Sequence, residues 1–213
     1  MQRLRITYAR GDELRYVSHL DMARLWERAV RRAGLPLFYS RGFTPHARIS
    51  IAAPLAVGVT AAAELLDLYL EEPVPPAEAQ ARLYAQLPAG LTISDVTEVD
   101  QLAPSLQSQM RAAEYLATFR EPLPSLDLGT AVQDLLARES IPYERRREGK
   151  VKALDLRPFL QALSVATVDG RPALRMRLRM DTAGSVRPDE VLDALSLAAH
   201  PVRLHRERVI LAE

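Results

Sequence analysis

Residues 4–34 read LRITYARGDELRYVSHLDMARLWERAVRRAG, and this stretch decides the fold class. Its first six residues alternate apolar and polar side chains, which is typical of a half-buried strand. Ser18 is an N-cap residue with Asp21 three positions on, and apolar residues then recur about every 3.6 residues until Gly34. The pattern predicts a strand, a turn and an amphipathic helix over residues 19–33.

The rest of the first half continues the alternation of strands and helices. The prolines at 75 and 76 begin a predicted helix that ends near residue 87. Period-two and apolar runs predict further strands at residues 38–40, 47–53, 64–71 and 91–99. The resulting order, β-α-β-β-α-β, is that of a split β-α-β or ferredoxin-like unit.

The second half repeats this rhythm without residue-level similarity. Helices are expected at residues 128–139 and 188–198, and Asp169-Gly170 predicts a hairpin turn. Strands are expected at residues 115–120, 143–146, 151–156, 164–168, 174–180 and 202–211. We therefore predict an α+β fold of two tandem ferredoxin-like (split β-α-β) units with antiparallel sheets. The expected units are residues 1–100 and 113–213, joined by a polar linker over residues 101–112.

Composition and charge limit the classes of function. The 213 residues are 48% apolar and 26% charged, with a net charge of only +1, which is ordinary for a globular protein. Of the 28 basic residues, 26 are arginines, and the other two are Lys150 and Lys152. A GC-rich genome accounts for such a bias, so only local clustering points to function. The sequence has no cysteine and no apolar signal core, which predicts a cytoplasmic protein without thiol-ligated metal clusters.

A positive stripe occupies the predicted solvent face of the first helix. It contains Arg24, Arg28, Arg31 and Arg32, and Arg41 and Arg48 follow soon after in the chain. If the later segment folds back beside the helix, these side chains form a concave positive surface suited to phosphate groups. The alternative is an ordinary solvated helix face, partly neutralised by Glu27.

The loop RGFTPHARIS, residues 41–50, contains the histidine best placed for chemistry. Gly42 gives the backbone freedom and Pro45 fixes it just before His46. The imidazole could serve as a general acid or base, a hydrogen-bond donor to phosphate or a metal ligand, and the alternative is a structural histidine. We assign positioning roles to a set of residues around this loop and the helix start: Ser18, His19, Asp21, Gly42, Phe43 and Pro45.

A second basic cluster lies in a predicted hairpin of the second half. Both lysines of the chain lie here, around Gly149, which a uniform genomic bias does not explain. The predicted phosphate-binding residues are Arg145, Arg146, Arg147, Lys150, Lys152 and Arg157. The alternatives are an exposed loop or a structural ion-pair cluster that includes Asp155. The four histidines show no metal-ligand spacing, so no metal site is predicted.

Two stretches resemble a known family. These are LRYVSHLDMARLWERAVRRAGLPLFYSRGFTPHARISIAAPLAVGVTAAAELLDLYL, residues 14–70, and REGKVKALDLRPFL, residues 147–160. They resemble the radical-SAM-linked proteins of the DUF2344 family, whose members are encoded beside or fused to a radical-SAM protein. Thr44 stands where that family usually has Asn, and Glu148 where a basic residue is common, which weakens a catalytic role for the loop.

The resemblance implies a division of labour between two proteins. A radical-SAM enzyme needs cysteines that bind an iron–sulfur cluster, so the cluster and S-adenosylmethionine are expected on the partner and no cofactor on this chain. We expect an RNA-binding accessory protein that presents tRNA or rRNA to the radical-SAM partner. Two alternatives stay open. One is an RNA-processing or RNA-modifying enzyme that uses His46, and the other is a protein-interaction module of the partner without RNA.

Overall fold

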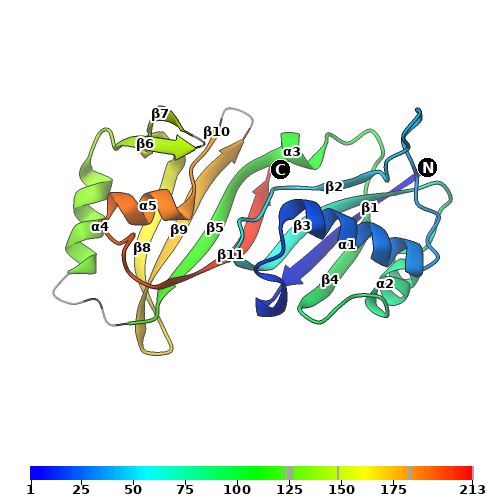
Figure 1. Ribbon diagram of the computed structural model, residues 1–213, viewed down its shortest axis with the longest axis horizontal. Coiled ribbons are helices and arrows are strands. Elements are labelled where there is room, and N and C mark those ends of the chain that lie inside the picture. The colour runs from blue at the N-terminus through cyan, green and yellow to red at the C-terminus, as the bar shows by residue number, and fades with distance from the viewer. Residues whose placement is uncertain (122, 124–126, 148, 182–183, 213) are drawn as a thin grey trace. The chain divides into compact units, whose positions relative to one another are not determined.

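The computed structural model describes residues 1–121, 123, 127–147, 149–181 and 184–212 (Figure 1). Helices and largely antiparallel strands are mixed along the chain, so the predicted α+β class is confirmed. The chain divides into two compact units, Met1–Met110 with Leu211–Glu213 and Arg111–Ile210. In the part of the chain that the structure describes, no helix is both long and apolar enough to cross a membrane.

The first unit follows the order β-α-β-β-α-β and adds a short helix after it. Its elements are β1 (Gln2–Arg10), α1 (His19–Arg32), β2 (Ile49–Ile51), β3 (Thr60–Leu70), α2 (Pro76–Tyr84), β4 (Leu91–Glu98) and α3 (Leu106–Gln109). All strand pairs are antiparallel: β1 lies between β3 and β4, and β2 pairs with β3. Figure 1 shows α1 and α2 on the same face of this sheet.

The core of the first unit lies between its sheet and its helices. Leu4 and Ile6 point to one face of β1 and are fully buried, and the register places Leu4 beside Leu68 of β3. Trp26 of α1 is also fully buried, and its ring meets Tyr8 edge to face at 5.0 Å between centroids. The alternation of β1 and the period of α1 thus build one apolar layer.

An ion-pair network occupies the opposite face of the first sheet. The Arg3 guanidinium donates to Asp67 at 2.9 and 2.5 Å, and Arg5 donates to the other carboxylate oxygen of Asp67 at 2.8 Å. Arg3 also donates to the carbonyl oxygens of Ala103 at 2.7 Å and Pro104 at 2.9 Å. The segment expected to be a linker is therefore held against the first unit, where it forms α3.

The second unit contains a sheet, two helices and a separate hairpin. Its elements are β5 (Met110–Phe119), α4 (Leu128–Ala137), β6 (Pro142–Arg147), β7 (Lys150–Asp155), β8 (Leu160–Val168), β9 (Arg171–Asp181), β10 (Gly184–Ser185), α5 (Pro188–Ala194) and β11 (Val202–Leu211). In the sheet, β9 lies between β5 and β8, and β11 lies on the other side of β5. Strands β6 and β7 pair only with each other among the described strands.

The turn between β8 and β9 matches its sequence prediction. Asp169 and Gly170 both have positive φ, 51° and 72°, and Val168 pairs with Arg171 across them. This is the geometry that an Asp-Gly hairpin turn requires. The turn fixes the register of β9, so that Leu174, Met176 and Leu178 enter the core with α4 and α5, while the residues between them face away from it.

Candidate functional site

The face of the second sheet that lies opposite its helices is rich in arginine. Strand β9 alternates core residues with arginines, and the arginines are Arg171, Arg175, Arg177 and Arg179. The first three are exposed and Arg179 is half-buried. Our sequence predictions did not include these residues, although the period-two spacing in RPALRMRLRM, residues 171–180, could have revealed them.

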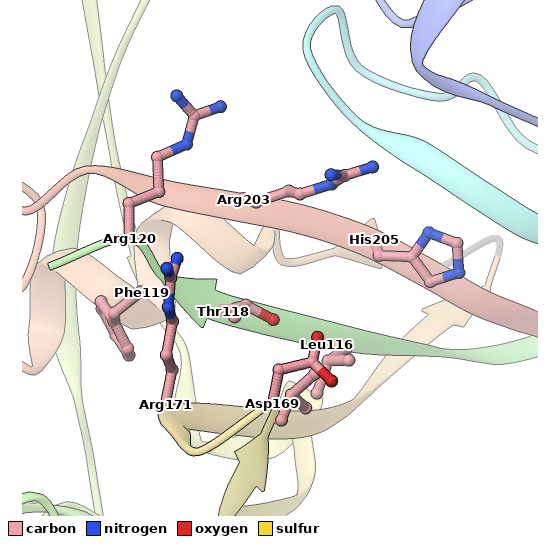
Figure 2. Close-up of a pocket in the computed structure, with 9 residues that line it drawn as sticks. Leu116, Thr118, Phe119, Arg120, Asp169, Arg171, Arg203 and His205 are labelled. Carbon is pink, nitrogen blue, oxygen red and sulfur yellow. The ribbon is translucent and has the colours of Figure 1, made fainter.

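A hollow of about 650 Å³ lies at the hairpin end of this face. Half-buried Leu116 and Thr118 of β5 contribute apolar and hydroxyl groups to its lining. Figure 2 shows arginines that approach the hollow from three elements: the end of β5, the β8–β9 hairpin and β11. The charged and ionisable residues that line it are Arg120, Asp169, Arg171, Arg203 and His205.

Local structure brings these side chains to the same end of the sheet. The backbone N–H of Arg120 donates to the carbonyl of Pro201 at 3.0 Å, which joins the end of β5 to the start of β11. Arg171 is the first residue of β9 after the Asp169-Gly170 turn. Thr118 pairs with Ala173 in the ladder, so the end of β5 lies beside the start of β9.

Positive charge exceeds negative charge in this hollow. Three arginines line it, and Asp169 is the one carboxylate among the described lining residues. Arg120 and Arg171 are exposed, and neither forms a salt bridge with any residue that the structure describes. Guanidinium groups that have no carboxylate beside them are available to bind phosphate in a bidentate way.

A second hollow of about 590 Å³ on the same face has its arginines neutralised. Arg175 forms a bidentate pair with Glu207, with both distances 3.1 Å, and Arg208 forms one with Glu114 at 2.7 and 3.1 Å. The hydrogen bond from Arg208, supported by the charges of Arg208, Arg177 and Arg175, holds the pKa of the Glu114 carboxyl below its ordinary value. This hollow has less capacity for an external anion.

The predicted arginine stripe lies on the solvent side of α1. Arg24, Arg28, Arg31 and Arg32 are all exposed. Arg24 pairs with Asp21 at 3.1 Å. The hydroxyl of the N-cap residue Ser18 donates to Asp21, and this bond is the main reason why the pKa of Asp21 is lowered, with a further contribution from Arg24. The other three arginines form no salt bridge with a described residue.

The loop that contains His46 is exposed over residues 41–46. The His46 backbone is held on both sides, because its N–H donates to Ser40 Oγ at 3.0 Å and its carbonyl accepts from the Ser40 N–H at 2.9 Å. The imidazole forms no hydrogen bond within the described chain, and Phe43 is fully exposed. Gly42 has a φ of 147°, which favours glycine.

Other residues predicted for this surface lie elsewhere. His19, in the first turn of α1, is half-buried and lines a small cavity with Glu64. Arg48 stacks on Tyr69 at 4.1 Å from the ring centroid, and Tyr69 lies on the sheet face of Asp67, away from α1. Arg48 is therefore not part of the α1 stripe. No hydrogen bond or ion pair joins Arg41 to that stripe among the residues described.

The predicted basic hairpin forms as β6 and β7. Its arginines differ in whether other groups of the protein already occupy their hydrogen-bond donors. Arg145 donates to both oxygens of buried Glu190, at 2.5 and 2.8 Å, and Arg157 donates to the carbonyls of Arg138 and Leu160. Arg146 pairs with Glu144 at 3.2 Å. Asp155 accepts backbone N–H bonds from Ile141 and Arg157, which lower its pKa. Lys150 and Lys152 are exposed; the Arg147 side chain and Glu148 lie outside the described residues.

Comparisons with known proteins show the family but no curated relative. No curated protein matches the sequence. The chain is similar to a solved structure of a Cbf5-Nop10-Gar1 complex at 10% identity and a TM-score of 0.48, over 98% of this chain and 48% of that one, so it spans about half the length of that relative. It is also similar to an unknown protein from Galdieria sulphuraria at 16% identity and a TM-score of 0.25, over 96% and 98%.

The family comparison covers most of the chain. The family described as "Uncharacterized protein conserved in bacteria (DUF2344)" matches residues 3–188. This range includes both stretches that carry the resemblance, as well as β9 and the hollow as far as Arg171. The chain belongs to the DUF2344 family of bacterial proteins.

Proposed function

We propose that this protein binds RNA in the bacterial cytoplasm and presents it to a radical-SAM partner enzyme. The observation that carries the proposal is the exposed arginine-rich face of the second sheet, where Arg120 and Arg171 have no acidic partner among the described residues. Single-stranded nucleic acid is bound by positive grooves that follow the phosphate backbone. The exposed arginines of α1 give the first unit a positive surface of its own.

The proposal includes the fold that we infer for both units. The first unit has the order β1-α1-β2-β3-α2-β4, and its sheet neighbours run β2-β3-β1-β4. With the β6–β7 hairpin and β10 set aside, the second unit has the order β5-α4-β8-β9-α5-β11, with sheet neighbours β8-β9-β5-β11. The two orders correspond element by element, which supports a tandem pair of ferredoxin-like units in which the hairpin is an insertion.

The radical-SAM partner is proposed from the family resemblance and from composition. This sequence contains no cysteine, so it offers no thiolate for an iron–sulfur cluster. We assign the cluster, S-adenosylmethionine and the radical chemistry to the partner. This chain would hold and orient the substrate RNA, a role that needs positioned cations and no chemistry of its own.

Binding to RNA tests the proposal directly. We expect the affinity for a single-stranded oligoribonucleotide, measured by fluorescence anisotropy, to fall steeply as salt increases. In the variant Arg120→Ala/Arg171→Ala, the slope of log K against log salt should become shallower by about 0.7 for each phosphate that the protein no longer neutralises. Arg179→Ala is the matched control, because Arg179 lies on the same strand and already pairs with Asp181 at 2.6 Å.

The arginines of α1 form a second and independent test set. Arg28→Glu/Arg31→Glu should weaken RNA binding, whereas Arg82→Ala should not, because Arg82 of α2 is paired with Glu78. Undetectable or salt-independent binding would overturn the RNA proposal. Copurification of the partner that survives nuclease treatment, with no RNA retained, would favour a protein-interaction module instead. An RNA-cleavage or modification activity of the isolated chain that His46→Ala abolishes would make it an enzyme.

A further inference from the structure

The two hollows on the second sheet face differ in a way that points to a specific ligand. We propose that the first hollow binds the terminal phosphate monoester of an RNA strand. Arg120 and Arg171 donate hydrogen bonds to the phosphate, and Asp169 accepts a hydrogen bond from a ribose hydroxyl. This inference rests on the proposed RNA function and deepens it, because it states which part of the RNA the site recognises.

The charge of the hollow suits a monoester better than a phosphodiester. A phosphate monoester carries about −1.5 to −2 charges at neutral pH, because its second pKa is near 6, whereas a diester carries a single charge. Arg120 follows the end of β5 and Arg171 begins the neighbouring strand β9, so the two guanidinium groups belong to adjacent strand ends, and Arg203 of β11 lines the same hollow. Several guanidinium forks around one phosphate match a dianion with three terminal oxygens.

The surroundings of the hollow favour a strand end over the middle of a strand. A strand that continued along the face would bring its next phosphates to the second hollow. There Arg175 and Arg208 are already paired with Glu207 and Glu114, so the next phosphates would meet carboxylates. The carboxylate of Asp169 disfavours a further phosphate in the same way. A single terminal phosphate avoids both repulsions.

The carboxylate of Asp169 also favours a ribonucleotide over a deoxyribonucleotide. This carboxylate is an acceptor only, and it lines the hollow with the hydroxyl of Thr118. A ribose beside the phosphate offers hydroxyl donors that a deoxyribose lacks in part. Asp169 lines the hollow from the β8–β9 turn, where its φ is 51°.

The volume is consistent with one nucleotide. At about 650 Å³ the hollow lies within the range of roughly 300–1,000 Å³ that is usual for small-ligand sites. Leu116 lines the hollow with an apolar side chain, against which a sugar or a nucleobase can pack. The same chemistry is present in a free nucleoside monophosphate, so the two sources must be separated by experiment.

The test compares two chemical forms of the 5′ end of one RNA, using the complete protein. A short single-stranded oligoribonucleotide, labelled at its 3′ end, is prepared with either a 5′-phosphate or a 5′-hydroxyl. We expect the phosphorylated form to bind at least about tenfold more tightly, which is the low end of what hydrogen bonds to a charged group contribute. Arg120→Gln/Arg171→Gln should reduce this ratio to about one, while Arg175→Gln, in the neutralised hollow, should preserve it.

The outcomes separate this inference from the function on which it rests. If the 5′-phosphate and 5′-hydroxyl RNAs bind equally to the wild-type protein, the terminal-phosphate site is wrong and RNA binding stands. The same conclusion follows if the double variant still prefers the 5′-phosphate RNA. If neither RNA binds but adenosine monophosphate does, the phosphate site stands with a free nucleotide as its ligand and the RNA function is wrong. Asp169→Gly keeps the positive φ and should reduce the preference for ribo- over deoxyribonucleotide. An unchanged preference would remove Asp169 from the site.

Discussion

The two units of this protein use arginine in opposite ways on the strand faces that lie away from their helices. In the first unit, Arg3 has 1% of its side chain exposed and Asp67 has none, and Arg5 completes the pair of cations around that carboxylate. In the second unit, Arg171 and Arg120 are exposed and have no carboxylate partner among the residues described. The residue type is the same in both units. Whether an arginine stabilises the fold or is available to bind a ligand depends on whether a carboxylate lies beside it.

This difference shows that arginine at alternate positions of a strand is not evidence for a binding surface by itself. The decisive residue is the carboxylate on the neighbouring strand. Asp67 lies directly across from Arg5 in the ladder and neutralises it. Ala173 and Val168 are the cross-strand neighbours of Thr118 and Arg171 at the hollow, and neither can neutralise a guanidinium. Burial strengthens the first arrangement, because a charge without a partner is costly inside a protein.

The largest effect should come from removing the carboxylate of the first unit. Asp67→Asn leaves the buried Arg3 guanidinium without its counter-charge, and we expect the free energy of unfolding to fall by about 3–5 kcal/mol. Chemical denaturation followed by circular dichroism measures this loss. Glu114→Gln is the matched control, because it removes a carboxylate that also holds arginines but lies on the more exposed face. Equal losses in the two variants would contradict the contrast between the faces.

A smaller effect, on RNA affinity, is expected when the second hollow loses a carboxylate and so becomes more like the first hollow. Glu114→Gln leaves the guanidinium groups of Arg208 and Arg177 without their carboxylate, so these arginines become available to phosphate. The affinity for single-stranded RNA should rise by roughly two- to fivefold, since an exposed ion pair contributes little and is readily replaced. Anisotropy titration at one fixed salt concentration measures the change. A weaker affinity would show that Glu114 supports binding.

The smallest effect is a dependence of stability on pH. The pKa of Glu114 is lowered in the folded protein, chiefly by the hydrogen bond from Arg208, so its contribution to stability is complete above the ordinary value of 4.5. That contribution is lost as the pH falls through the lowered pKa. The difference in unfolding free energy between the wild type and Glu114→Gln should therefore be present at neutral pH and vanish in acid. A difference that persists in acid would assign the effect to packing.

Local patterns in the sequence predicted the elements well, because their signals are local. Ser18 caps α1 as expected, and the Asp169-Gly170 turn has the predicted conformation. The pairing of charges was not predictable, because the partners lie far apart in sequence. Arg145 was expected to meet phosphate, but it pairs with Glu190 on α5. The first hollow depends on four strands and a turn that only the fold brings together.

The bonds from Arg3 to the carbonyls of Ala103 and Pro104 have a consequence for dissecting the protein. A first-unit fragment cut at residue 100 would keep the buried guanidinium but lose two of its acceptors, and donors buried without partners destabilise a fold. The usable boundary therefore lies beyond α3, at Met110, where the first unit passes into the second. The polar composition of residues 101–112 predicted a linker, but the hydrogen bonds from Arg3 make Ala103 and Pro104 part of the structure of the first unit.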